Sequence, residues 1–555
     1  MSHARLFGLA SALLIAGCDT TGVRCPGATV EDPDLGACVC PPGSTPIEGG
    51  YDCAFDDAAV GSDGGSDAGV DAAPPIDAGP PPGMPRAWYP WNGYRTGSVH
   101  GAANGTLRPT FEWDAADGAT DYQIQLDDSC ASPGFADCTF DSPELDERTT
   151  TTVFRPDADL SVSMSAPVGR RYYWRVRGCR GDVCGDWSRV MYLNVGRTEC
   201  DLNGDGYGDL AAGRSGLGIT VHLGGPSGFS MTPVRYWPDV TAFGVACGDV
   251  NADGFADLAL AMDLATSVGR VHYGQSGGVA DSPSEEFDLD GFGVALLDLD
   301  GGGFDDLVVS DPMLAGPSGA VGGIRVRATE SMETTTRLGD LAGVRLGGGN
   351  FQLVGRTDLD EDGVADVLVG GQGVAGIFFG AGTRFLRVAD PSPELGVSFG
   401  SAVSVWEGYF AIGGSRSSGT VAYATHLYST DGGSVLRVLR WSEGSLLAGF
   451  GEAKVVADRG ARRDPVIARL DSGTLVVETA LSAPSESYSR TLAGAVDANG
   501  DGYTELLVSS GEDNADTLDG AVYVRDGRAP HPLIQILRNP QTEGPRGNFG
   551  DYLPR

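Results

Sequence analysis

Residues 201–210 read Asp-Leu-Asn-Gly-Asp-Gly-Tyr-Gly-Asp-Leu, and this ten-residue pattern decides the fold of the chain. It recurs four times, and the five copies start at intervals of 48, 49, 60 and 139 residues, at Asp201, Asp249, Asp298, Asp358 and Asp497. The last interval is about three repeat lengths, which predicts two further copies that have lost the pattern. Phe399-Gly400 and Phe450-Gly451 mark their positions, because a Phe-Gly pair also precedes clear copies, as at Phe243-Gly244. The sequence therefore predicts seven repeats.

Each repeat combines the acidic loop with an apolar strand, a glycine and a further strand. Four short strands per repeat of about 40–50 residues are typical of a β-propeller blade. The Phe-Gly pair, the acidic loop and the Gly-Ala-Val-Tyr-Val strand at 520–524 resemble FG-GAP repeats, the units of the integrin α-subunit propeller. The resemblance covers residues 198–555 and implies a seven-bladed β-propeller that meets its ligands on the face opposite the calcium loops.

The two ends of this region bear on how the ring would close. The chain ends with a Phe549-Gly550 pair that no acidic loop follows, whereas the first loop has only Val195-Gly196 at the corresponding place. We expect the C-terminal strand to complete the first blade, which closes the ring and protects its edges. The alternative is that Val195-Gly196 is the native first strand and the C-terminal segment is surplus.

The acidic loops are predicted to bind calcium. Oxygen side chains at positions 1, 3 and 5, a glycine at 6, a backbone carbonyl at 7 and a carboxylate at 9 supply the six or seven hard ligands that Ca²⁺ prefers. An EF-hand is excluded, because position 12 of the first loop is Ala212 and strand-like runs follow the loops. We expect three to five ions. The candidate ligands, with position 7 contributing its carbonyl oxygen, are Asp201, Asn203, Asp205, Tyr207 and Asp209; Asp249, Asn251, Asp253, Phe255 and Asp257; Asp298, Asp300, Phe304 and Asp306; Asp358, Asp360, Asp362, Val364 and Asp366; and Asp497, Asn499, Asp501, Tyr503 and Glu505.

The five loops are not equally complete. Gly302 stands at position 5 of the Asp298 copy, which leaves its occupancy open. Glu505 replaces the usual aspartate at position 9 of the last copy, and we expect it to serve as a ligand. The alternative for every copy is a turn of Asp, Asn and Gly that binds no ion.

The N-terminus predicts export and lipidation. Residues 1–17 combine a basic start with a short apolar run, which is typical of a secretory signal and too short to span a membrane. The run ends Ile15-Ala16-Gly17-Cys18, which resembles the lipobox of bacterial lipoproteins and implies that Cys18 is acylated. We expect a lipid-anchored protein of the bacterial cell envelope, at the outer membrane or cell surface in preference to the inner membrane.

The other ten cysteines predict disulfides, because an even number in an exported protein is typical of a disulfide framework. Their local grouping predicts Cys130–Cys138, Cys179–Cys184 and Cys200–Cys247. The first four cysteines allow three pairings. Residues 38–53 resemble the last half of an EGF-like module, which implies Cys40–Cys53 and leaves Cys25–Cys38. A zinc site built from these four is the alternative, and no histidine lies near them.

Composition divides the rest of the N-terminal part. We expect residues 18–53 to form the anchor and a Cys-rich stub, and residues 54–86, rich in Ala, Asp, Gly and Pro, to form a disordered linker. Residues 87–197 alternate apolar and polar side chains between turns, which predicts a small β-sandwich. Trp113, the strand at 122–126 and the Tyr-Tyr-Trp-Arg-Val-Arg run at 172–177 resemble fibronectin type III domains. The whole chain is predicted to be all-β.

Charge and missing motifs restrict the function. The 555 residues carry a formal net charge of −37, which excludes the basic footprint of a nucleic-acid-binding protein. The six histidines form no obvious catalytic cluster, and His222 and His272 occupy equivalent strands of two repeats, which favours a structural role over catalysis. We therefore predict a monomeric binding or adhesion module for an extracellular protein or carbohydrate, and no enzyme. The alternatives are an extracellular enzyme acting on polysaccharide and a purely structural envelope protein.

Overall fold

The computed structural model describes most of the chain from residue 80 onward and four short strands before it. The described residues are 30–32, 37–39, 44–46, 53–55, 80–130, 135, 138–214, 218–240, 242–262, 268–288, 293–311, 314–316, 319–320, 322–328, 333–338, 352–371, 373–393, 398–406, 409–416, 422–431, 434–441, 447–450, 454–457, 465–471, 474–481, 488–510, 520–538 and 553. The chain divides into two compact units, Met1–Asp77 and Ala78–Arg555.

In the first unit the described residues form two hairpins. Strand β1 (Val30–Asp32) pairs with β2 (Ala37–Val39), and β3 (Ser44–Pro46) pairs with β4 (Cys53–Phe55), both antiparallel. The predicted signal peptide, Cys18, Cys25 and Cys40 lie outside the described residues, so lipidation and the Cys25–Cys38 and Cys40–Cys53 pairings remain predictions.

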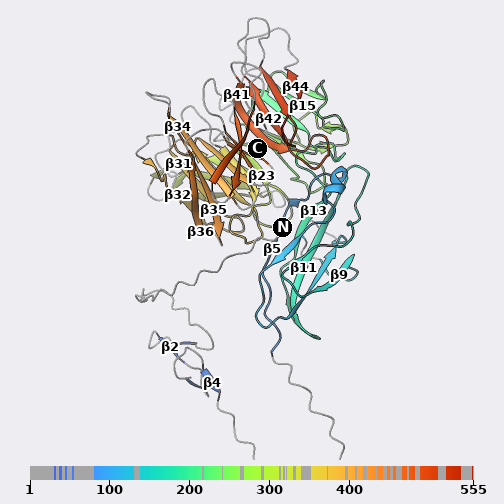
Figure 1. Cartoon of the computed structure of the whole chain (residues 1–555), viewed down its shortest axis with the longest axis vertical. Helices are drawn as coiled ribbons and strands as arrows, with labels where there is room; N and C mark the ends of the chain where they lie inside the picture. Colours follow the sequence, from blue (N-terminus) through green and yellow to red (C-terminus); the bar gives the residue numbers. More distant parts are fainter. Residues whose placement is uncertain are drawn as a thin grey trace, which may run out of the picture. The chain divides into compact units, whose positions relative to one another are not determined.

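Residues 80–197 of the second unit form two sheets around one core, and we call this part the sandwich (Figure 1). One sheet has the order β10-β7-β5, and the other has the order β6-β13-β11-β8-β9, with β12 also paired to β11. The strands are β5 (Ala87–Tyr89), β6 (Tyr94–Arg95), β7 (Phe111–Trp113), β8 (Asp121–Asp127), β9 (Leu145–Thr149), β10 (Val153–Phe154), β11 (Arg170–Arg180), β12 (Val183–Trp187) and β13 (Met191–Val195). A short 3₁₀ helix, η1 (Val99–Asn104), precedes β7. The alternating strands place Phe111, Ile124 and Trp174 in the shared core.

The rest of the described chain contains seven successive sheets of consecutive antiparallel strands, the first with three strands and the others with four. Their strands are β14 (Leu210–Arg214), β15 (Gly218–His222) and β16 (Arg235–Trp237); β17 (Ala242–Gly248), β18 (Asp257–Met262), β19 (Val268–His272) and β22 (Glu285–Asp288); β23 (Val294–Leu297), β24 (Asp306–Asp311), β27 (Gly323–Arg327) and β28 (Thr334–Leu338); β29 (Gln352–Thr357), β30 (Asp366–Gly371), β31 (Val374–Phe378) and β32 (Phe385–Val388); β33 (Ala402–Trp406), β34 (Tyr409–Arg416), β35 (Ala422–Asp431) and β36 (Ser434–Trp441); β37 (Leu447–Phe450), β38 (Lys454–Ala457), β39 (Val466–Asp471) and β40 (Thr474–Ala480); and β41 (Tyr488–Val496), β42 (Glu505–Ser510), β43 (Ala521–Arg525) and β44 (Leu533–Arg538). Two small hairpins interrupt the second and third sheets. The pair β20–β21 (Gly274–Gln275 and Gly278–Val279) lies between β19 and β22 in the chain, and the pair β25–β26 (Ala315–Gly316 and Gly319–Ala320) lies between β24 and β27.

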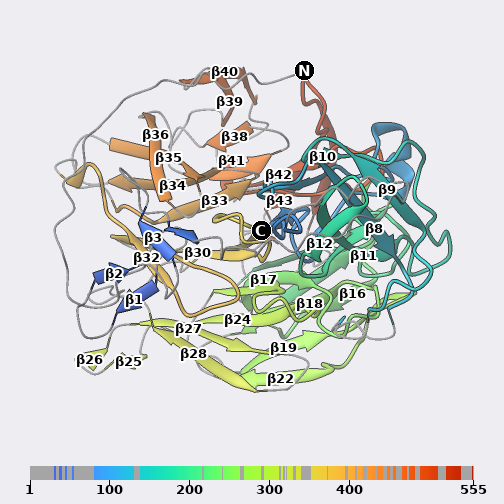
Figure 2. The same cartoon turned by 90° about the horizontal axis from the view of Figure 1, so that it is seen from below.

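Consecutive sheets pack against each other through their first strands. Each first strand contacts the first strand of the next sheet, from β14 through β41. In Figure 2 the first strands β17 and β33 lie toward the middle of this group, whereas β22, β28, β36 and β40 lie at its outer edge. The inner strands are buried on both faces, which explains why runs such as Asp366–Gly371 are buried along their whole length.

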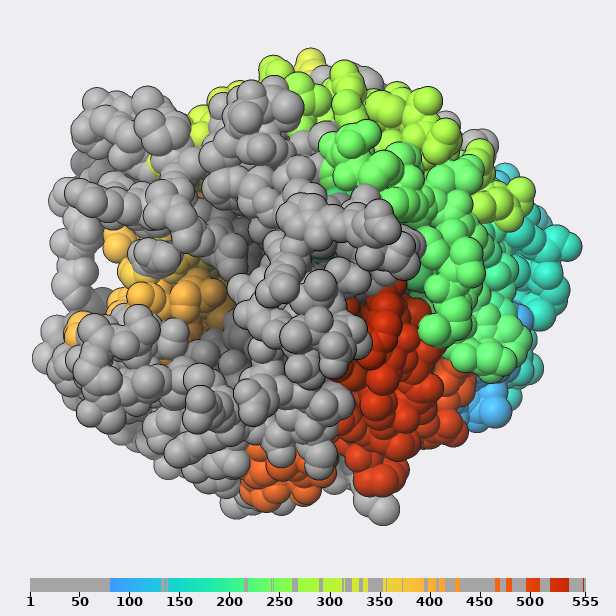
Figure 3. Space-filling view, turned by 90° about the horizontal axis from the view of Figure 1, so that it is seen from above, coloured from blue at the N-terminus to red at the C-terminus, as the bar shows by residue number. Residues whose placement is uncertain are grey.

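The first and last sheets also lie side by side. One hydrophobic cluster contains Leu210 and Ile219 of the first sheet together with Leu507 and Val522 of the last sheet. Figure 3 shows the same neighbours, with the first sheet in green against the last sheet in red. Leu553 is buried in this cluster, whereas Phe549 and Gly550 lie outside the described residues, so the closure of the ring by the C-terminal strand stays a prediction.

Several expectations can be compared with these observations. The all-β class is confirmed, and so are the disulfides Cys130–Cys138, Cys179–Cys184 and Cys200–Cys247. Four-stranded sheets, β33 to β36 and β37 to β40, occupy the interval in which two degenerate repeats were predicted. The three disulfides indicate an extracellular or secreted protein. Within the described part of the chain, no helix has the length and apolar character needed to cross a membrane.

Candidate metal centres at the acidic loops

The five acidic loops adopt one common conformation between the first and second strands of their sheets, and the first of them leads into β14. In every loop the amide of the position-6 glycine donates to the position-1 carboxylate, at 2.6–3.1 Å. The amide at position 2 donates to the position-9 carboxylate in every loop, at 2.6–3.1 Å. Glu505 makes this bond as the aspartates do, and the Asp298 loop keeps the pattern despite Gly302. The sequence repeat is therefore a structural repeat.

The glycine at position 6 is required by the backbone. Its φ lies between 80° and 95° in all five loops, at Gly206, Gly254, Gly303, Gly363 and Gly502. Only glycine adopts this left-handed conformation without strain. In the Asp298, Asp358 and Asp497 loops the position-1 and position-9 carboxylates each bring an oxygen within 4.8 Å of the other.

These carboxylates are buried. Asp209, Asp257, Asp366 and Glu505, all at position 9, have no measurable exposure, and position-9 Asp306 is 2% exposed. Burial raises the pKa of Asp201, Asp298 and Asp358 to about 7, and it raises the pKa of Asp257, Asp306 and Glu505 to about 8. Neighbouring carboxylates contribute to the rise of these pKa values, and backbone hydrogen bonds to the carboxylates oppose it. Carboxylates buried this closely require protons or a bound cation to balance their charge.

Three loops gather three carboxylates into one group whose ligand atoms lie within 4.8 Å of one another. These groups are Asp298, Asp300 and Asp306; Asp358, Asp360 and Asp366; and Asp497, Asp501 and Glu505. Asp360 Oδ1 and Glu505 Oε1 are buried and have no hydrogen-bond partner. Carboxylate groups with an unpartnered oxygen suit a hard cation, and the residues present therefore fit a metal ion.

In the first two loops the asparagine at position 3 donates to the position-5 aspartate. Asn203 Nδ2 donates to Asp205 Oδ2 at 2.9 Å, and Asn251 Nδ2 donates to Asp253 Oδ2 at the same distance. The last loop also has an asparagine at position 3, Asn499, whose Oδ1 accepts from the Asp501 amide at 2.9 Å. The amide at position 7 donates to the position-5 carboxylate, as Tyr207 and Phe255 both do. The predicted ligand role of the position-7 carbonyl oxygens, and of Asn203, Asn251 and Asn499, stays a prediction.

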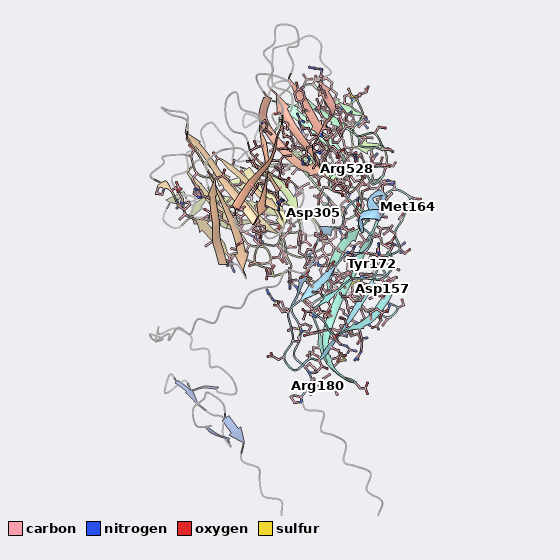
Figure 4. The ribbon with its side chains drawn as sticks, viewed as in Figure 1. Asp157, Met164, Tyr172, Arg180, Asp305 and Arg528 are labelled. Carbon is pink, nitrogen blue, oxygen red and sulfur yellow. A yellow bond between two sulfur atoms is a disulfide. The ribbon has the colours of Figure 1, made fainter. Side chains whose placement is uncertain are left out.

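Backbone hydrogen bonds join four loops into a series that runs from the last sheet to the third. The amide at position 8 of one loop donates to the carbonyl at position 1 of the preceding loop: Gly208 to Asp497, Ala256 to Asp201, and Asp305 to Asp249, at 2.8–3.1 Å. Asp305 adds a side-chain bond, because its Oδ2 accepts from the Asp249 amide at 2.7 Å. Figure 4 labels Asp305 where the sandwich meets the sheets.

The sandwich contacts every acidic loop, beginning with the two loops nearest η1. Ser98 Oγ donates to the Gly206 carbonyl at 2.5 Å, and the ring of His100 stacks on that of Tyr207 at 4.2 Å between centroids. Asn104 Nδ2 donates to the Asp501 carbonyl at 2.5 Å. These donors bind the outer, backbone side of the loops and leave the carboxylates facing inward.

Strands β11 and β13 contact the second and third loops. Tyr192 Oη donates to Asp298 Oδ2 at 2.8 Å, and the Arg171 guanidinium donates to the Gly303 carbonyl at 2.6 Å. Guanidinium nitrogens of Arg171 and Arg197 each lie 3.9 Å from Asp249 Oδ2. Burial raises the pKa of Asp249, and these two arginines oppose the rise. The second loop is thus partly neutralised by the sandwich itself.

The fourth loop is held by the start of the sandwich. The Asn92 amide donates to the Gly363 carbonyl at 2.9 Å, and the Arg86 guanidinium donates to the Glu361 carbonyl at 2.6 Å. Arg86 was assigned to the linker by composition, whereas its side chain also pairs with Asp114 of the sandwich at 2.7 Å. Residues 80–86 therefore contribute contacts to the described sandwich.

The sandwich residues that contact the acidic loops could not be predicted from the sequence. Ser98, His100, Asn104, Arg171 and Tyr192 carry no motif, and their partners are backbone atoms or side chains far along the chain. Asp305 had a weak signal, because it is the one acidic residue at position 8 of a loop. A group of carboxylates in the sandwich was not predicted either; it consists of Asp127, Asp128 and Glu144.

Two histidines of the repeats occupy equivalent buried positions. His222 Nδ1 lies 2.8 Å from the Ser230 carbonyl, and His272 Nδ1 lies 2.9 Å from the Ala280 carbonyl. Burial lowers the pKa of both. Each histidine contacts the carbonyl of the residue eight positions further on. The same contact in two repeats favours a structural role for both histidines.

Comparison with known proteins leaves the family open. No family model matches the chain, and no curated protein matches it. Among solved structures it is similar to a luciferin-regenerating enzyme, with 13% identity, a TM-score of 0.27, and coverage of 43% of this chain and 74% of that one. It is also similar to the extracellular domain of a candidate one-component system from B. thetaiotaomicron, with 12% identity, a TM-score of 0.30, and coverage of 60% of this chain and 39% of that one.

Proposed function

We propose that residues 198–555 form a closed seven-bladed propeller of FG-GAP type, in which acidic loops bind three to five calcium ions. Support comes from seven successive sheets, from the hydrophobic cluster shared by the first and last sheets, and from the hydrogen bonds that link loops across the same junction. The all-oxygen donor set favours calcium over softer metals. The position-1 and position-9 carboxylates would hold the ion in each loop, and the ion would balance their charge.

The proposed role of this propeller is to bind an extracellular protein or carbohydrate. In an antiparallel sheet of consecutive strands, the connections between strands one and two and between strands three and four lie at one end. The other end carries the connections between strands two and three and those leading to the next sheet. The observation that carries the proposal is that the sandwich contacts the loops of the first end. The second end is therefore the proposed ligand surface.

The proposed setting is the bacterial cell surface, where a lipid on Cys18 would anchor the chain and the linker would separate the second unit from the membrane. The disulfides support an extracellular location. A second candidate function, polysaccharide hydrolysis, has no observation in its favour and serves as an outcome of the test.

The test is a binding screen of the chain lacking residues 1–18, in 1 mM calcium, against arrays of bacterial and host polysaccharides and of extracellular matrix proteins. Hydrogen exchange then locates the bound ligand. We expect protection at Gly371 and Val374, where β30 meets β31, and no change at Gly363 in the acidic loop of the same sheet. Protection confined to the acidic loops would contradict the assignment of the ligand surface. Release of new reducing ends from a bound polysaccharide would identify an enzyme instead.

A further inference from the structure

The sandwich contains a carboxylate group that no repeat accounts for. Strand β8 ends at Asp127 and β9 begins at Leu145, so that Asp128 opens the connection between them and Glu144 closes it. Asp127, Asp128 and Glu144 each offer one carboxylate oxygen, and these oxygens all lie within 4.8 Å of one another. Both ends of one connection therefore meet in an acidic group.

A buried oxygen in this group lacks a partner. Asp127 is 1% exposed, and its Oδ1 accepts from the Ser129 amide at 2.7 Å and from the Ser129 hydroxyl. Asp127 Oδ2 is buried and has no hydrogen-bond partner. A buried carboxylate oxygen without a donor is costly, and a bound cation is the usual way in which such a cost is offset.

The charge of the group is only partly balanced. The Arg170 guanidinium pairs with Asp128 Oδ2, and the Asp128 amide donates to Glu144 Oε2 at 2.9 Å. The Arg175 guanidinium also interacts electrostatically with Asp127, so two guanidiniums face three carboxylates and the group keeps a net negative charge. Asp128 is half-buried and Glu144 is exposed, and an ion can reach the group from solvent.

We propose that Asp127, Asp128 and Glu144 form a divalent cation site of the calcium class that fastens the two ends of the β8–β9 connection. All three ligands are carboxylate oxygens, the donor type that hard cations prefer. The Cys130–Cys138 disulfide closes the same connection internally. The ion and the disulfide together would fix the two ends of the connection, where Phe135 and Phe140 pack beside Tyr173 and Tyr192 of strands β11 and β13. The site is separate from the acidic loops and does not depend on whether they bind calcium.

The test is a count of bound calcium per chain by equilibrium dialysis at 1 mM free calcium, with the full chain. Glu144→Gln is expected to lose one equivalent, because Glu144 is exposed and the substitution removes a ligand without emptying the core. The matched control is Glu147→Gln, which changes an exposed acid on β9 and is expected to keep the wild-type count. If the acidic loops bind no calcium, the wild-type count becomes one and the variant count zero.

A second variant distinguishes loss of calcium binding from loss of folding. Asp128→Asn is expected to lose the same single equivalent while its unfolding midpoint in chelator stays within about 3 °C of wild type. If Glu144→Gln and Asp128→Asn both keep the wild-type count, the site does not exist. Loss of more than one equivalent in Glu144→Gln would also overturn the proposal, because it would show coupling to other sites.

Discussion

The fourth and fifth sheets share one topology but differ in the connection between their first two strands. Between β29, which ends at Thr357, and β30, which begins at Asp366, the chain inserts an acidic loop. Between β33 and β34 only two residues separate Trp406 from Tyr409, and Trp406 pairs with Tyr409. Both sheets have four antiparallel strands in sequence order. An acidic loop is therefore not needed to form this kind of sheet.

The fourth and fifth sheets are stabilised by different interactions. Strands β34 and β35 have 8 and 10 residues, whereas β30 and β31 have 6 and 5. The sheet without a loop has longer hydrogen-bonded ladders. The sheet with the loop has buried carboxylates and contacts to the sandwich instead, through Gly363 and Glu361. We infer that the loops serve cation binding and the attachment of the sandwich.

Removal of cations should give the largest effect and should separate the two kinds of sheet. With a Kd of about 10⁻⁴ M, each occupied site adds about 1.4 kcal/mol at about 1 mM calcium. Several sites together should raise the unfolding midpoint by about 10 °C relative to chelator. Hydrogen exchange in chelator should accelerate in β30 more than in β34. Equal acceleration in both strands, or no shift of the midpoint, would break the comparison.

Acidification should shift the unfolding midpoint in opposite directions with and without calcium. The raised pKa values of Asp201, Asp358 and Glu505, about 7 to 8, exceed those of the unfolded chain, about 4. Between these values the folded chain without metal binds protons that the unfolded chain does not, so its stability falls as the pH rises. In chelator the unfolding midpoint should therefore be higher at pH 5.5 than at pH 8. In calcium it should be lower at pH 5.5, because protons displace the ion. Parallel pH profiles with and without calcium would contradict buried carboxylate ligands.

A single loop substitution should remove a fraction of the calcium effect. Asp366→Asn keeps the volume of a buried position-9 side chain but removes its charge. The two oxygens of Asp366 accept from the Gly380 and Leu359 amides, and an asparagine can accept only one of these bonds. We therefore expect a cost of about 1–3 kcal/mol in chelator and about 1–2 kcal/mol more in calcium, where a ligand of the ion is lost as well. Asp281→Asn, at an aspartate that is 81% exposed, is the matched control and should change neither value. A cost of the same size in chelator would show that Asp366 acts only through its hydrogen bonds.

The smallest effect on the free energy of unfolding is expected where the sandwich contacts the fourth acidic loop. Arg86→Ala removes one hydrogen bond to the Glu361 carbonyl and an exposed ion pair with Asp114, and should cost about 0.5–1 kcal/mol. Arg171→Met removes a buried cation that contacts both Gly303 and Asp249 and should cost more. Chemical denaturation measures both. A larger loss for Arg86→Ala than for Arg171→Met would place the main attachment at the fourth loop.

Much of the fold was visible in the sequence because the repeat is local. The position of each acidic loop, the glycine at position 6 and the carboxylate at position 9 follow from ten consecutive residues. Glu505 accepts the same backbone hydrogen bond as the position-9 aspartates, and its predicted role as a ligand stays a prediction. Three disulfides followed from the local grouping of cysteines. The partners of the loops did not follow, because Ser98 and Gly206, or Tyr192 and Asp298, are about a hundred residues apart and share no pattern.

The sequence by itself determined the all-β class, the spacing of the repeats and the residues that could hold cations, because a tight turn and a crowded set of carboxylates are encoded within one short segment. Only the tertiary structure decided that the sandwich contacts the acidic loops, that Arg171 and Arg197 approach Asp249, and that Asp127 meets Glu144. Such contacts depend on which surfaces the folded sheets bring together. A residue far along the chain can contribute charge or hydrogen bonds to a site, although its own sequence neighbours do not indicate that role.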